Sequence, residues 1–215
     1  MNLRSRVLEE LGTVYDPELD EPITTLGFVG SCVVTEDGDV SVRLRLPTPQ
    51  CAPNFAFLMV ADARAALERV PGVGRTQVVL EDHYTGDEIN AAVGRGEGFD
   101  GAFPGETAGS LDALRALFQR KALLARQSRL LGDARTLGEL DGPDAERCRE
   151  LRRALGLDAG DGAPAFVTGD GTPVGAAELP RFRRMARLTA LSLETNGGMC
   201  RDLLRVRYKE EEVAA

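Results

Sequence analysis

Histidine and tryptophan are almost absent from this sequence, which has one histidine, His83, and no tryptophan among 215 residues. A single histidine excludes a histidine-rich metal site within one chain, and it excludes a facial triad built on two histidines. Cysteines are few and widely spaced, so no Cys-x-x-Cys pair and no zinc-finger signature is present. The four cysteines are Cys32, Cys51, Cys148 and Cys200.

Long apolar runs are also missing. No run approaches the roughly 18 residues that indicate a membrane span. The chain begins Met-Asn-Leu-Arg-Ser-Arg, then alternates apolar with acidic residues, and lacks the apolar core of a signal peptide. These features predict a cytoplasmic protein without membrane contact, in which the cysteines are thiols and not disulfides.

The formal net charge of −8 argues against binding to nucleic acid or to anionic membranes. One basic cluster is a candidate exception, and we interpret it as a solvated helix face that pairs with nearby acids. It consists of Arg181, Arg183, Arg184 and Arg187. The sequence also has no glycine-rich phosphate loop between a strand and a helix, and no Gly-x-Ser-x-Gly elbow.

The first part of the chain, residues 1–83, predicts a small α/β domain of the α+β kind. Apolar residues at helical spacing mark a helix over residues 3–14. Two valine-rich runs follow at 28–35 and 40–46, and Asp37-Gly38 between them is a hairpin signal.

A second helix is predicted to begin at Pro53, because proline suits the first helical turn. A short strand follows at 77–80. The order of elements is therefore helix, hairpin, helix and strand, in which two helices can cover one face of a small sheet.

The remaining chain predicts an arm followed by a mainly helical region. Residues 84–109 are polar and rich in glycine, so we expect an arm or linker with no more than a short helix at 88–93. Residues 110–215 carry helical patterns at 110–131, 145–155 and 180–193. Asn196-Gly197-Gly198 is expected to end the last of these helices.

Cys51 is the strongest candidate for chemistry. It lies in a proline-rich loop directly before the predicted second helix. Amide groups and the helix dipole at such an end favour a thiolate, which is the form that binds iron or attacks an electrophile. The alternative is a small buried cysteine with a structural role.

Two acidic groups and a second cysteine are further candidates. Asp16 and Glu18 flank a proline after the first helix, and they either ligate metal or stabilise the turn. Cys200 supplies a second thiolate if the C-terminal region folds over Cys51, and it is otherwise a packed thiol.

The surroundings of His83 allow two interpretations. The acids near it either hold a divalent metal together with the imidazole, or they form a polar rim near Cys51 that recognises a client. Neighbouring side chains in a strand point to opposite faces, so Glu81 and His83 can share an ion but Asp82 cannot join them. The acids are Glu81, Asp82, Asp87 and Glu88.

Four short motifs occur in order within residues 3–83: Asp16-Pro17-Glu18-Leu19, Leu26-Gly27-Phe28-Val29, Pro47-Thr48-Pro49-Gln50-Cys51-Ala52-Pro53 and Pro71-Gly72-Val73. Together they resemble the metal–sulfur (iron–sulfur) cluster assembly family that includes SufT and PaaD. The resemblance implies the small fold of the C-terminal, cluster-carrying domain of NifU-type scaffolds. It also implies that Cys51 is the reactive cysteine, supported by Asp16, Glu18 and Thr48. The chain departs from the family at Cys51-Ala52-Pro53, where the family has Cys-Pro.

The long C-terminal region distinguishes this chain from the usual one-domain members. This extended form resembles accessory proteins of bacterial multicomponent di-iron hydrocarbon monooxygenases such as propane monooxygenase. The resemblance implies that the client is a di-iron hydroxylase or its reductase.

We therefore expect an accessory factor, and not an enzyme, that carries iron or an iron–sulfur cluster transiently. Its partners would be a client metalloenzyme or an assembly scaffold. The alternatives are a metal-free, chaperone-like adaptor and an enzyme with Cys51 as nucleophile, for which His83 is the one apparent base. One cysteine is too few for a four-thiolate cluster, so Cys200, a second subunit of a homodimer or the client would supply further ligands.

Overall fold

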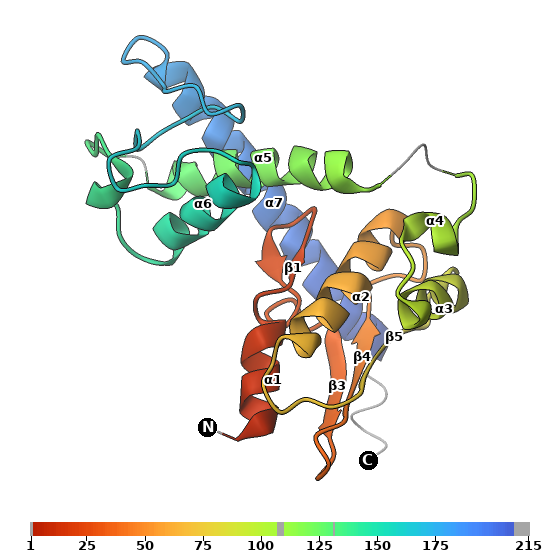
Figure 1. The fold of residues 1–215 in the computed structure, drawn as a ribbon. Coiled ribbons are helices and arrows are strands. Elements are labelled where there is room, and N and C mark those ends of the chain that lie inside the picture. Colours follow the sequence, from red (N-terminus) through yellow and green to blue (C-terminus); the bar gives the residue numbers. More distant parts are fainter. Residues whose placement is uncertain (1, 107–109, 131, 209–215) are drawn as a thin grey trace. The chain divides into compact units, whose positions relative to one another are not determined.

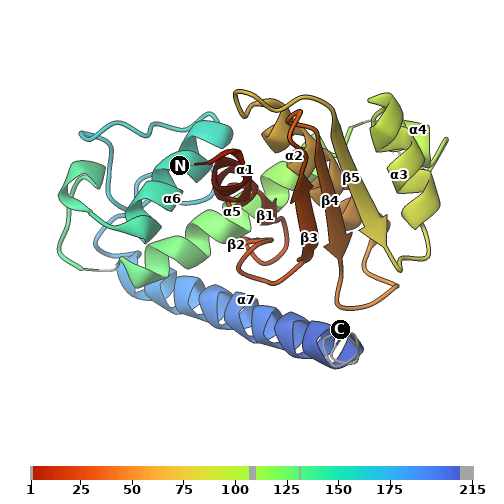
Figure 2. The ribbon, with the colours of Figure 1, turned by 90° about the horizontal axis from the view of Figure 1, so that it is seen from below.

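The computed structural model describes residues 2–106, 110–130 and 132–208 (Figures 1 and 2). They form two compact units. The first contains the chain up to Leu111 together with the segment from Gly197 onward, and the second is Asp112–Asn196. This division differs from the expected one at residues 83/84 and 109/110, because the last described turns of the chain belong to the first unit.

The element order is mixed α and β, followed by a helical C-terminal region, which confirms the expected fold class. The first unit holds α1 (Leu3–Leu11), β1 (Tyr15–Asp16), β2 (Glu21–Pro22), β3 (Val29–Val34), β4 (Val40–Arg45), α2 (Pro53–Glu68), β5 (Thr76–Glu81), α3 (Gly86–Arg95), α4 (Phe99–Ala102) and the end of α7 (Leu179–Tyr208). The second holds α5 (Asp112–Arg129), the 3-10 helix η1 (Leu137–Glu139), α6 (Pro143–Ala154) and the start of α7.

The main sheet has the order β3-β4-β5, with β3 antiparallel to β4 and β4 parallel to β5. The predicted hairpin is present, and Gly38 in its turn has a φ of +86°, a conformation that glycine adopts without strain. A Cβ atom at Gly38 would lie 2.5 Å from the carbonyl oxygen of Gly72. The amide of Gly74 also donates to the carbonyl of Gly38 at 2.9 Å, so the hairpin turn fixes the loop before β5.

The core of the first unit lies between the sheet and its helices. Along β4, Val40, Val42 and Leu44 are buried, and they alternate with more exposed polar residues as the sequence predicted. α2 begins at Pro53, as expected, and packs against the sheet, with α1 beside it (Figure 2). β4 then leads into the loop that carries Cys51, and α2 leads out of it, so this packing positions the thiol.

α1 is three residues shorter than the predicted helix over 3–14. Gly12 follows its last residue, and the hydroxyl of Thr13 donates to the carbonyl of Glu10 at 2.7 Å, which closes the helix end. Val14 is buried, but it serves the next turn: its carbonyl accepts from the amide of Ile23 at 2.9 Å.

Residues 84–109 were expected to form an arm with no more than a short helix at 88–93. The structure has a helix there, as part of the longer α3, and α4 follows it in place of an extended arm. Two of the glycines that suggested an arm lie at the ends of α3: Gly86 starts it, and Gly96 ends it with a φ of +74°. Between them Ile89, Ala92 and Val93 are buried at helical spacing in the core of the first unit.

α7 continues without a break through Asn196-Gly197-Gly198, where the sequence predicted the end of a helix. Two glycines weaken a helix, but tertiary contacts override that preference. A Cβ at Gly197 would lie 2.8 Å from a carboxylate oxygen of Glu21, so the missing side chain allows close approach.

Among the described residues, no helix has the length and apolarity that a membrane crossing requires.

Buried polar groups hold the second unit together. Arg152 is fully buried and donates to the carbonyls of Pro164 at 2.9 Å and Ala165 at 2.8 Å. Gln127 accepts from the amide of Val167 at 2.8 Å and donates back to its carbonyl at 3.0 Å. These two side chains attach the loop between α6 and α7 to the helices.

The outer edge of β5 is closed by one side chain of α3. Asn90 accepts from the amide of Leu80 at 2.8 Å and donates to its carbonyl at 3.0 Å.

We predict that Asn90→Ala lowers the free energy of unfolding of the first unit by about 2 kcal/mol, because both Leu80 groups lose their partner. Hydrogen exchange of the Leu80 amide measures this directly, with the exposed Gln77→Ala as control on the same strand. Unchanged protection of Leu80 in Asn90→Ala would contradict the assignment.

Candidate functional site

Cys51 lies where the sequence predicted, two residues before the first residue of α2, and it is half-buried. Ala52 occupies the position before the first helical turn, and its carbonyl accepts from the amides of Phe55 and Ala56. The amide of Cys51 donates to the carbonyl of Thr48 at 3.4 Å, which folds the loop into a turn. The thiol sulfur lies 3.5 Å from the hydroxyl oxygen of Thr48. Thr48 is therefore the direct polar neighbour of this thiol.

His83 fixes the backbone of this loop. Its Nε2 lies 2.8 Å from the carbonyl oxygen of Cys51, and a carbonyl only accepts, so Nε2 carries the proton. Its Nδ1 lies 3.3 Å from the amide nitrogen of Thr85, which donates to it. The next residue, Tyr84, donates its amide to the carbonyl of Pro49 at 3.0 Å. The segment after β5 thus lies along the Cys51 loop and binds it at two points.

Two of the acids near His83 have other partners. Glu81 forms ion pairs with Arg43 at 2.8 Å and with Arg45 at 2.9 Å. Asp82 accepts from the hydroxyl of Tyr208 at 3.2 Å. Across residues 2–106, 110–130 and 132–208, no three His, Cys, Asp or Glu side chains are arranged to hold one metal ion. The geometry therefore does not bring the Glu81, Asp82 and His83 set together around an ion, and the same holds for Cys51 and Cys200 with the acids of residues 16–18.

Asp16 stabilises its own turn from a buried position. One of its carboxylate oxygens accepts from the amides of Glu18 and Leu19, each at 2.9 Å, which is the turn-stabilising interpretation of the sequence. Only 7% of Asp16 is exposed. Burial raises the pKa of Asp16 to about 6, the two amide hydrogen bonds oppose this rise, and the charges of Glu18 and Glu21 add to it.

Cys200 lies in the same region as Cys51, although 149 positions separate the two in the sequence. Both cysteines pack against the core of the first unit. Burial raises the pKa of Cys200 to about 11, and negative charge at Asp16, Cys51 and Glu18 contributes to the rise. The structure therefore gathers two thiols and the acidic turn within electrostatic range of one another.

The other two cysteines lie elsewhere. Cys32 is half-buried on β3, and Cys148 is fully buried on α6 in the second unit. Both positions fit a structural role.

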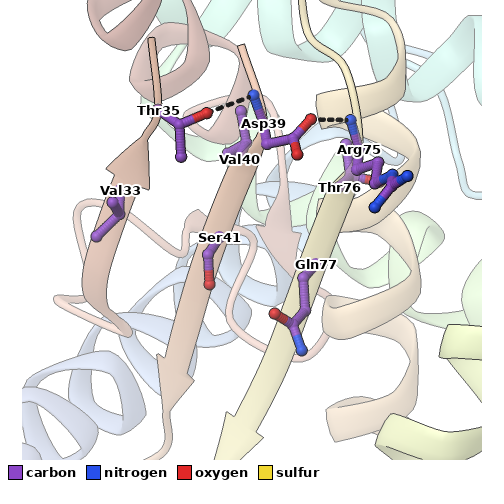
Figure 3. Close-up of a pocket in the computed structure, with 8 residues that line it drawn as sticks. All are labelled: Val33, Thr35, Asp39, Val40, Ser41, Arg75, Thr76 and Gln77. Atoms are coloured by element: carbon purple, nitrogen blue, oxygen red, sulfur yellow. Dashed lines mark hydrogen bonds between the residues drawn. The ribbon is translucent and has the colours of Figure 1, made fainter. Parts of the chain in front are cut away.

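A surface hollow of about 320 Å³ lies between the ends of β3 and the starts of β4 and β5 (Figure 3). This is the end of β4 opposite to the Cys51 loop. Its main polar group, Asp39, is already bonded: its amide donates to the hydroxyl of Thr35 at 3.0 Å, and its carboxylate accepts from the amide of Arg75 at 2.8 Å. These two bonds close the hairpin and join it to the start of β5, so Asp39 already has a structural role. We therefore do not assign the hollow to the site.

At the end of α7 the sequence singled out Cys200, but not the arginines that attach this segment to the region. Arg201 pairs with Glu21, and Arg207 donates to the carbonyls of Leu46, at 3.0 Å, and Asp82. The signal in the sequence was the helical spacing of Cys200, Leu204 and Arg207, which continues the amphipathic pattern beyond the two glycines.

Comparison with known proteins gives matches to the first unit. Residues 4–79 match the family model of iron-sulfur cluster assembly proteins. The chain is 35% identical over 74 residues to an Fe-S protein maturation auxiliary factor of Porphyromonas gingivalis, covering 34% of this chain and 69% of that protein. It is 30% identical over 90 residues to an uncharacterised protein of Methanocaldococcus jannaschii, covering 42% of this chain and 93% of that protein.

A third relative is a larger protein. The chain is 36% identical over 80 residues to an iron-sulfur cluster carrier protein of Mycobacterium tuberculosis. This match covers 37% of the present chain but 20% of the carrier, so it concerns one part of that protein.

The burial of Asp16 predicts a pH dependence of stability. Its pKa of about 6 in the folded chain exceeds the ordinary value of about 3.9, so between these values the folded state binds more protons than the unfolded state. Its contribution to stability is therefore present below about pH 4 and is lost as the pH rises through 6. Two units of pKa correspond to about 3 kcal/mol.

We predict that Asp16→Asn removes this dependence, because the amide oxygen of asparagine still accepts from the turn but does not ionise. As the pH rises from 4 to 8, the free energy of unfolding of the variant increases by up to about 3 kcal/mol relative to that of the wild type. Hydrogen exchange of the β4 amides in increasing urea at both pH values measures it, with the exposed Glu36→Gln as control. If the free energies of unfolding of Asp16→Asn and the wild type differ by the same amount at pH 4 and pH 8, Asp16 does not titrate in this range.

Proposed function

Because this chain belongs to the iron–sulfur cluster assembly protein family, we propose that it is a non-enzymatic accessory factor that carries iron or an iron–sulfur cluster to a client metalloenzyme. Cys51 is the proposed cargo ligand, and Cys200 is the proposed second thiolate. Asp16, Glu18 and Thr48 support Cys51 in this proposal. The gathering of two thiols beside a buried acidic turn is the observation that carries it.

The electrostatics of the region support a positively charged cargo. Burial and neighbouring negative charge raise the pKa values of Asp16 and Cys200, so each group keeps a proton more readily than usual. A bound iron ion reverses this effect, because a nearby cation favours the ionised form of carboxylates and thiols. Loading would therefore release protons and would be favoured by higher pH.

The number of thiols supports a shared and transient site. Thiolate-bound iron–sulfur clusters usually take four cysteine ligands. Cys51 and Cys200 would supply two, and a second copy of the chain or the client would supply the others. A cargo held by shared ligands can pass from one protein to the next by ligand exchange, which is what a carrier needs.

The client in our proposal is a multicomponent di-iron monooxygenase, either its hydroxylase or its reductase. The support for this choice is the resemblance of the extended chain to accessory proteins of such systems. We place this exchange in the cytoplasm, where thiols stay reduced.

The test is anaerobic purification of the full chain, followed by iron and sulfide analysis. We predict that the wild type retains iron, with sulfide if the cargo is a cluster, and that Cys51→Ser lowers the bound iron at least about tenfold, because it removes a direct ligand. Cys32→Ser is the matched control, since Cys32 is also a half-buried thiol of the first unit. Equal iron in Cys51→Ser and the wild type would refute the role of Cys51.

Client maturation separates a carrier from a metal-free adaptor, which is the second candidate function. In a cell that produces the di-iron monooxygenase, a carrier requires Cys51, and Cys51→Ala should abolish client activity while Cys32→Ala preserves it. Full client activity with Cys51→Ala, together with no iron on the purified wild type, would favour the adaptor.

A further inference from the structure

The last three turns of α7, residues 197–208, have one face on the first unit and one face in solvent. We call this segment the α7 clamp. Its inward side chains recur at helical spacing, and Cys200 and Leu204 pack against the core. The outward side chains are exposed: Met199, Asp202, Leu203, Arg205 and Val206.

Polar contacts attach the α7 clamp to the three segments that make up the candidate site. Arg201 pairs with Glu21, which follows the acidic turn. Arg207 donates to the carbonyl of Leu46 at 3.0 Å, directly before the proline-rich Cys51 loop. It also donates to the carbonyl of Asp82, directly before His83.

Tyr208 completes the attachment. Its hydroxyl donates to a carboxylate oxygen of Asp82 at 3.2 Å, and the guanidinium of Arg45 lies 4.7 Å from the centre of its ring. Burial raises the pKa of Tyr208 to about 12, so the hydroxyl keeps the proton that it donates. Asp82 has a φ of +52° in the turn after β5, a left-handed conformation in which Asp is more frequent than most residues other than glycine.

The contacts that hold the α7 clamp are weak enough for a partner to displace it. Apart from Cys200 and Leu204, it is held by ion pairs and hydrogen bonds of partly exposed side chains, and such contacts are individually weak. A partner surface that offers cations to Glu21 and donors to the Leu46 and Asp82 carbonyls can replace them one by one. Cys200 leaves the site with the clamp, which also removes the proposed second thiolate.

We propose that the α7 clamp is an autoinhibitory cover that restricts access to Cys51 and Cys200 in the free chain. Its regulatory meaning rests on the proposed role of Cys51, but access to the thiols is a property of the cargo-free chain and is measured without iron. A negative result for the cover therefore does not contradict the proposed iron binding, and a negative iron analysis does not contradict the cover.

The experiment follows the rate at which N-ethylmaleimide modifies each cysteine of the full, cargo-free chain, resolved by mass spectrometry of peptides. In Arg207→Ala and Arg201→Glu we expect the rates at Cys51 and Cys200 to rise about two- to fivefold each, which is the effect of losing one contact of this kind. Arg205→Ala is the control on the same helix, because Arg205 is exposed and pairs with Asp202 within the helix.

The charge-swapped variant Glu21→Arg with Arg201→Glu restores the pair with reversed sign, and it should return both rates to the wild-type values. Cys32 reports on general loosening of the first unit and should keep its rate in every variant. Unchanged rates at Cys51 and Cys200 in both opening variants would overturn the proposal. If modification of Cys32 also becomes faster, the charge-swapped variant distinguishes the two explanations. Rates at Cys51 and Cys200 that stay high in this variant overturn the proposal, and rates that return to the wild-type values support it.

Discussion

The hydrogen bond from the His83 imidazole to the carbonyl of Cys51, 2.8 Å long, joins the two segments on which the candidate site depends. Cys51 follows β4, and His83 follows β5, so the parallel pairing of these strands brings both segments to the same end of the sheet. The second bond, from the amide of Tyr84 to the carbonyl of Pro49, holds the loop at another point. The thiol is thus held by backbone contacts, which leaves its sulfur available for chemistry beside Thr48.

Burial of charge is the second constraint on this region. Burial raises the pKa of Asp16 to about 6, and Cys200, with a pKa of about 11, lies within electrostatic range of it. A folded chain that tolerates this cost holds groups that keep their protons more readily than usual and that a nearby cation would ionise, because desolvated anions gain more from a cation than solvated ones do. The same arrangement explains why the proposed site would favour iron over an anionic ligand.

Much of the first unit could be predicted from the sequence, because its signals are local. Asp37-Gly38 encodes the hairpin turn, and Pro53 encodes the start of α2. The errors came from glycines read without tertiary context. Around α3 they cap a helix whose buried face belongs to the core, and at Gly197 the small residue lets α7 approach Glu21. The approach of Cys200 to Cys51 depends on contacts between distant segments, which no local pattern encodes.

The central claim is that the thiol of Cys51 binds the cargo, and protection from alkylation tests it most directly. The full chain would be loaded anaerobically with ferrous iron and sulfide, treated with N-ethylmaleimide, and each cysteine then quantified by mass spectrometry. We predict that loading suppresses modification of Cys51, and of Cys200 if it is the second ligand, while Cys32 reacts as in the unloaded chain. A loaded chain in which Cys51 reacts at the unloaded rate would contradict the account.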